Sequence, residues 1–152
     1  MQIIACGNPE CGDDAAGWLV AGHLGAMGLE AVGASIHTCA GQTTELLNIL
    51  RSDEDLILVD AVVTGAPAGS LHHWDGVPTV ASPSASSTHG LGVAEALRLA
   101  RVLGRAPRSL RVYGIEGRQF APGAPPSPEV MQAAERLAQQ IHATIEAERA
   151  LK

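Results

Sequence analysis

One short run of residues constrains the fold more than any other feature: Leu-Ile-Leu-Val at positions 56–59, which ends on Asp60. A strand with one face in solvent alternates apolar and polar residues, whereas a strand buried on both faces reads as a continuous apolar run. Strands of this second kind occur in parallel sheets that are covered by helices on either side. We therefore predict an α/β fold.

The rest of the chain alternates other apolar runs with helical patterns. Strands are predicted at 2–6, 31–38, 56–59 and 110–115, and helices at 15–27, 43–50, 90–103 and 127–151. The turn at 65–69 is too short for a crossover helix, so 70–75 should form an antiparallel strand at or near an edge. The sum is a three-layer α/β/α arrangement with a mostly parallel five-stranded sheet, in a single domain over residues 1–152.

Composition limits the class of protein. The 152 residues are 46% hydrophobic, but no apolar run is long enough to span a bilayer, so no membrane partner is expected. The start of the chain has no basic segment followed by a long apolar stretch, which favours a cytoplasmic protein. Three cysteines do not predict a disulfide framework. We expect a monomer.

The charge pattern argues against nucleic acid. The formal net charge is −6 and only 3% of residues are aromatic, whereas nucleic-acid binders are usually basic. Six arginines do gather between residues 98 and 118. Two interpretations of them stay open: solvation of a helical surface, or contact with an acidic partner segment.

The loop after the first strand carries two adjacent acids, Asp13 and Asp14. Gly7 and Gly12 have the spacing of a phosphate-binding loop, but the acids stand where that loop has lysine and serine. Carboxylates repel phosphate and attract cations, so a metal ion is the more plausible ligand. One aspartate could simply cap the following helix, but a single cap does not explain two.

Other polar residues are predicted at the same edge of the sheet. Asp60 ends the third strand, His89 precedes a helix, and Glu116 follows the last strand. Taken singly, each could be a strand terminator or an incidental loop residue. The set of Asp14, Asp60 and His89 would offer two carboxylates and one imidazole. Such a donor set is suited to Ni²⁺, Zn²⁺ or a similar cation.

These residues lie within motifs that resemble a known family, the [NiFe]-hydrogenase maturation endopeptidases. The motifs run in order along nearly the whole chain: Gly7-Asn8 with Gly12-Asp13-Asp14-Ala15-Ala16-Gly17, Val59-Asp60-Ala61, His89-Gly90-Leu91-Gly92, Gly114-Ile115-Glu116 and Ser127-Pro128-Glu129. The opening motif is the most specific. One departure is the segment 37–42, which is His-Thr-Cys-Ala-Gly-Gln where better-known members often have an Asp-Gly-Gly-Thr-like sequence.

The resemblance implies a metal-dependent endopeptidase. Its metal-site residues would be Asp14, Asp60 and His89, which would recognise nickel already installed in a hydrogenase large-subunit precursor before a carboxyl-terminal extension is removed. Nickel would come from the substrate, although zinc or cadmium could bind the isolated protein. Asp14 would also act in catalysis, and Asp13 is our candidate for a proton-handling helper, with Glu116 next.

Two other functions remain open from the sequence. The chain could be an α/β accessory protein that binds metal without proteolysis, or a module that holds a small ligand at the same edge. Both would use the same acids, as ligands or as helix caps. Cleavage of a precursor separates them from the protease.

Overall fold

The computed structural model describes residues 1–77 and 88–152, except for the side chains of residues 88–91. Its five strands lie in the order β2, β1, β3, β5, β4. They are β1 (Gln2–Cys6), β2 (Ser35–Cys39), β3 (Asp55–Val62), β4 (Leu71–Asp75) and β5 (Ser109–Glu116). Every neighbouring pair is parallel except β4 with β5, which is antiparallel and places β4 at an edge. The predicted sheet is confirmed.

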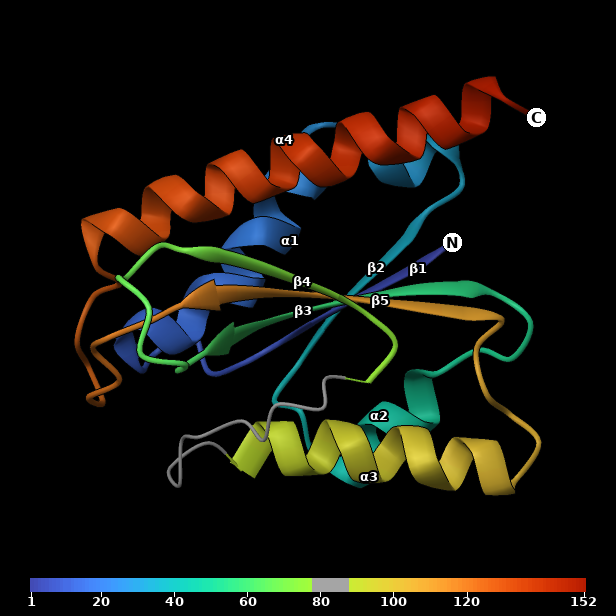
Figure 1. Cartoon of the computed structure of the whole chain (residues 1–152), viewed down its shortest axis with the longest axis horizontal. Coiled ribbons are helices and arrows are strands. Elements are labelled where there is room, and N and C mark those ends of the chain that lie inside the picture. The colour runs from blue at the N-terminus through green and yellow to red at the C-terminus, as the bar shows by residue number, and fades with distance from the viewer. Residues whose placement is uncertain (78–87) are drawn as a thin grey trace.

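Helices cover both faces of this sheet, as Figure 1 shows. They are α1 (Ala16–Ala26), α2 (Thr43–Ile49), α3 (Thr88–Val102) and α4 (Pro128–Ala150), with short 3-10 helices η1 (Gly12–Ala15) and η2 (Leu29–Val32). Helices α1 and α4 lie on one face, and α2 and α3 on the other (Figure 1). The three-layer α/β/α architecture is therefore confirmed. No helix in the described part of the chain is long and apolar enough to cross a membrane.

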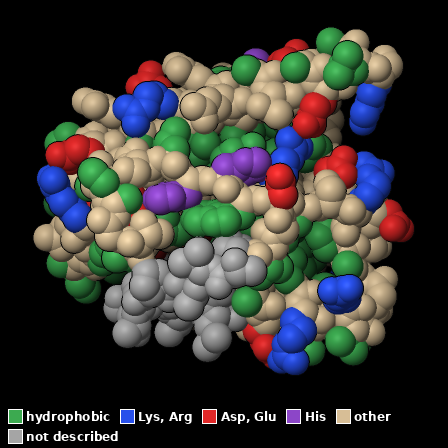
Figure 2. Space-filling view, in the orientation of Figure 1, with side chains coloured by type: hydrophobic (Ala, Val, Ile, Leu, Met, Phe, Trp, Pro, Cys, Tyr) green, Lys and Arg blue, Asp and Glu red, His purple; other side chains and the backbone are tan. Residues whose placement is uncertain are grey.

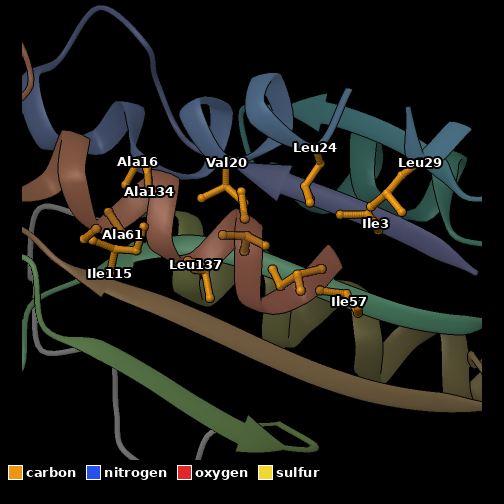
Figure 3. Close-up of a cluster of buried hydrophobic side chains, with 14 of the residues drawn as sticks. Ile3, Ala16, Val20, Leu24, Leu29, Ile57, Ala61, Ile115, Ala134 and Leu137 are labelled. Carbon is orange, nitrogen blue, oxygen red and sulfur yellow. The ribbon is translucent and has the colours of Figure 1, made fainter. Parts of the chain in front are cut away.

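The continuous apolar run of β3 is explained by burial on both faces. Ile57 and Val59 belong to the core under α1 and α4, whereas Leu56 and Leu58 belong to the core under α2 and α3. Figure 3 shows the first of these cores, where side chains of α1 and α4 meet those of the central strands. Alternate residues of one strand thus hold two helical layers onto the sheet.

Helix α1 approaches the sheet very closely at Gly17. A Cβ on Gly17 would lie 2.6 Å from the carbonyl oxygen of Cys6 and 2.8 Å from that of Val59. Any side chain would therefore push α1 off β1 and β3. Because Gly17 has no side chain, the first turn of α1 packs directly against these strands.

Most element boundaries agree with the prediction to within two residues, and two differ by more. Residues 29–32 form η2 instead of the start of a strand, because Gly28 and Gly33 on either side adopt left-handed conformations (φ 79° and 96°) that turn the chain. Strand β3 continues past Asp60 to Val62, because its register with β5 extends to the pair Val62 and Glu116. Asp60 therefore lies within β3 and does not terminate it.

Candidate functional site

The candidate site lies at the carboxyl edge of the parallel strands, where ligands bind in open α/β sheets. Asp14 belongs to η1, which follows β1, and Asp60 belongs to β3, the neighbour of β1. The turn η1 packs against β3. The fold thus brings the segments that carry these two acids together, although 46 positions separate them in the sequence (60 − 14).

The first loop folds back on itself around Asp14. The Asn8 backbone N–H donates to Asp14 Oδ2 across 2.9 Å. Gly7 has φ 139°, and a Cβ there would lie 2.1 Å from the Asp14 carbonyl oxygen. Only glycine fits this approach, so Gly7 holds the acid over the end of β1. Asp14 remains 8% exposed.

Asp60 faces the layer of α2 and α3. It follows Leu58 by two positions in β3, and Leu58 packs in the core on that face. Asp60 Oδ1 accepts a hydrogen bond from the Ala61 backbone N–H at 2.8 Å. The carboxylate therefore lies on the same side of the sheet as the beginning of α3.

His89 lies in the first turn of α3, and its side chain is outside the described part of the structure. The position of this turn is set by Gly92, where a Cβ would lie 2.2 Å from the Gly41 carbonyl oxygen. Gly41 follows β2 at the same edge of the sheet. Backbone packing thus brings the His89 segment to the edge that carries Asp14 and Asp60. Among the side chains that are described, no group of three His, Cys, Asp or Glu residues could hold a metal ion.

Asp13 is fully buried and accepts four hydrogen bonds. Oδ1 accepts from the backbone N–H and the hydroxyl of Ser127, at 2.6 and 2.7 Å. Oδ2 accepts from the backbone N–H groups of Arg118 and Gln119, at 2.8 and 3.1 Å. Burial raises the pKa of Asp13, but these donors lower it by more, so its pKa lies below the ordinary value.

These contacts favour a structural role for Asp13. The carboxylate ties η1 to the loop between β5 and α4, and its proton-handling role stays a prediction. The structure also bears on the alternative that an aspartate caps the following helix. Neither aspartate makes a side-chain capping bond to η1 or α1. The Ser127 side chain makes no capping bond to α4, and its hydroxyl donates to Asp13.

Glu116 makes a second buried carboxylate anchor and is 1% exposed. It accepts from the Thr64 backbone N–H at 2.8 Å and from the Thr64 hydroxyl at 2.6 Å. His72 Nε2 lies 3.1 Å from Glu116 Oε1. The side chain thus ties the loop between β3 and β4 to the end of β5. Glu116 lies at the predicted edge of the sheet, but its contacts favour a structural role in holding the loop between β3 and β4.

The structure pairs Cys6 with Cys39, which no sequence pattern predicted. They are directly opposite in the register of β1 and β2, with Sγ atoms 3.5 Å apart. The hydrogen bond between the two thiols lowers the pKa of Cys39 and raises the pKa of Cys6, which burial raises as well. Asp60 raises both pKa values through its charge, which places the thiols beside the candidate site. The signal available in the sequence was that Cys6 ends the predicted strand 2–6 and Cys39 directly follows the predicted strand 31–38.

Most of the arginines in the 98–118 stretch pair with acids of this chain. The pairs are Arg98 with Glu95, Arg108 with Asp55, Arg111 with Glu148, and Arg118 with Glu129. Figure 2 shows charges of both signs interspersed on one face of the molecule. This pattern supports solvation of the surface as the role of the arginines.

Several solved structures with a similar fold are described as hydrogenase maturation peptidases. The hydrogenase maturating endopeptidase HybD from Escherichia coli is 23% identical, with a TM-score of 0.79 over 97% of this chain and 92% of that one. The [NiFe] hydrogenase maturation protease HybD from Thermococcus kodakarensis is 24% identical, with a TM-score of 0.74 over 95% and 97% of the two chains. HycI from the same organism is 26% identical, with a TM-score of 0.68 over 92% and 88%.

The chain therefore shares the α/β/α fold of these proteins. The family model for hydrogenase maturation protease matches residues 40–144. This chain belongs to the hydrogenase maturation protease family. The comparison with curated proteins finds no match.

Proposed function

We propose that this protein is an endopeptidase that removes the carboxyl-terminal extension of a [NiFe]-hydrogenase large-subunit precursor after nickel insertion. The observation that carries the proposal is the meeting of the Asp14, Asp60 and His89 segments at one edge of the sheet. Membership of the maturation protease family supports the peptidase activity.

The donor set fits nickel as part of the substrate. Two carboxylates and an imidazole suit a borderline divalent cation, and so few ligands leave positions for groups of the precursor. A precursor without nickel would gain none of these contacts. Recognition of the substrate through its own metal would thus restrict cleavage to precursors whose metal site is complete.

The surroundings of each acid in this chain indicate which would bind metal and which would transfer a proton. Asp14 and Asp60 would hold the precursor's nickel against the sheet edge, with Asp14 presented by the loop that Gly7 allows. The precursor's nickel, once held there, would supply Lewis acidity toward a carbonyl or a water, and a neighbouring carboxylate of this chain would accept the released proton. Asp14 is the better candidate for that acceptor, because Asp13 already accepts four hydrogen bonds.

Mass spectrometry of a cognate precursor tests the proposal. The precursor is prepared with and without nickel and incubated with the protein. We expect loss of the carboxyl-terminal extension from the nickel-loaded form alone. An unchanged mass in both forms, with a correctly paired precursor, would contradict the peptidase proposal.

A binding measurement separates a protease from a metal-storing accessory protein. A protease that reads nickel in its substrate should bind free Ni²⁺ weakly, since part of the coordination comes from the precursor. Calorimetric titration of the purified chain with Ni²⁺, and with Zn²⁺ or Cd²⁺ for comparison, measures this. Tight uptake of Ni²⁺ without cleavage would favour the accessory protein.

A further inference from the structure

The Cys6 and Cys39 pair has no part in the proposed cleavage. The two residues end the adjacent parallel strands β1 and β2 and are paired in register. Their side chains are buried, at 1% and 2% exposed, and their Sγ atoms are 3.5 Å apart. At this distance one thiol can donate a hydrogen bond to the other.

The backbone at this position suits a disulfide. Neighbouring strands lie about 4.8 Å apart, within the Cα separation of roughly 4.4 to 6.8 Å that disulfides span. The sulfur atoms would have to close the remaining distance by rotation of the side chains.

We propose that Cys6 and Cys39 form a reversible dithiol–disulfide site at the carboxyl edge of the sheet, with a small peroxide as its oxidant. The inference does not depend on the proposed protease activity. Hydrogen peroxide is the oxidant proposed because the two cysteines are buried, and only an oxidant close to water in size could reach their sulfur atoms.

The reaction proceeds in two displacement steps. Cys39 loses its proton, and its sulfur attacks one oxygen of hydrogen peroxide. The O–O bond breaks, the leaving hydroxide takes up a proton to become water, and Cys39 becomes a sulfenic acid. The Cys6 sulfur then attacks the Cys39 sulfur, the S–O bond breaks, and the departing hydroxide takes the Cys6 proton as a second water. Two thiols lose two electrons in all, and the peroxide gains them.

Hydrogen bonding makes Cys39 the attacking group. The Gly41 backbone N–H donates to its sulfur, and the Cys6 sulfur lies within hydrogen-bonding distance of it at 3.5 Å. Thiolate character of this kind directs oxidation to one cysteine of a pair. Cys6 is then already in place as the resolving thiol.

The disulfide would lie under the loop that carries Asp14. The Cys39 carbonyl accepts from the Gly7 backbone N–H at 3.0 Å and from Trp18 Nε1 at 3.2 Å. Cys6 immediately precedes Gly7. Closing the bond would therefore join the two strand ends that position this loop.

The test uses the folded protein and a variant that removes the third cysteine. The Cys11→Ser variant is incubated with hydrogen peroxide, quenched with catalase, unfolded and alkylated. We expect both remaining thiols to be lost, a mass decrease of about 2 Da, and a cross-linked peptide that joins residues 6 and 39. Dithiothreitol should restore both thiols.

Wild-type protein and a second variant keep the test decisive. Wild-type protein should yield the same cross-linked peptide and retain one alkylatable thiol, at Cys11. The double variant Cys11→Ser, Cys39→Ser should show no mass decrease. Retention of both thiols by Cys11→Ser, oxygen addition without a cross-link, or disulfides that join two chains would each overturn the proposal.

Discussion

The Ser127 backbone N–H donates to Asp13 Oδ1 across 2.6 Å, although 114 positions separate the two residues. This bond ties the residue before α4 to the 3-10 turn that also contains Asp14. The turn that presents the candidate metal ligand is thus anchored by the residue next to it. Asp13 and Asp14 are neighbours in sequence with different surroundings.

Asp13→Asn should destabilise the protein by about 2 to 3 kcal/mol, because hydrogen bonds to a charged acceptor are stronger than those to an amide. The asparagine amide would also point an NH₂ group at backbone N–H donors. Urea unfolding monitored by circular dichroism measures the change. Asp53→Asn is the matched control, because Asp53 is exposed and has φ 64°, which asparagine tolerates. Equal stability of the two variants would remove the anchoring role.

The contribution of Asp13 should disappear in acid. A carboxyl group with a lowered pKa in the folded state stabilises the protein above its unfolded pKa, about 3.9 for aspartate. That stabilisation is lost as the pH falls through the lower pKa of the folded state. The gap in free energy of unfolding between wild type and Asp13→Asn should therefore be full at pH 6 and shrink below about pH 4. A gap that stays constant down to pH 2 would show that charge on Asp13 is unimportant.

Two glycines of α1 should respond in opposite directions to the same substitution. Gly17→Ala should cost about 2 to 4 kcal/mol, because its Cβ would overlap carbonyl oxygens of β1 and β3. Gly22→Ala should stabilise by about 0.5 to 1 kcal/mol, because nothing lies within 4 Å of the added methyl group and alanine favours helix. Thermal and urea unfolding of both variants provide the comparison. A neutral Gly17→Ala would mean that α1 does not rest directly on the strands.

Loss of the proposed metal ligands should abolish cleavage while the fold is retained. Asp14→Asn, Asp60→Asn and His89→Ala should each reduce processing of a nickel-loaded precursor by at least about 100-fold. The readout is the rate at which the shortened large subunit appears by mass spectrometry, with circular dichroism as the check on folding. Asp53→Asn again serves as the control. Any variant that cleaves within a few-fold of wild type would exclude that residue from the metal set.

Much of the fold could be predicted from local patterns. The run 56–59 indicated a doubly buried strand because each residue of this run packs in the core under one of the two helical layers. The short turn at 65–69 indicated an antiparallel edge strand, which is β4. The start of β2 was predicted too early, because the left-handed Gly28 and Gly33 allow a 3-10 turn that apolar periodicity does not reveal. The end of β3 was missed because its extension depends on pairing with β5.

The sequence by itself determined the fold class and the set of acids available at the carboxyl edge of the sheet. It could not divide their roles, since Asp13 and Asp14 have the same side chain and adjacent positions. Tertiary structure decided that division, because the donors around Asp13 come from residues 118, 119 and 127. Tertiary structure likewise decided that Glu116 accepts a hydrogen bond from Thr64 and that Cys6 lies beside Cys39. The environment of a side chain depends on which distant segments pack beside it, and local sequence patterns do not contain that information.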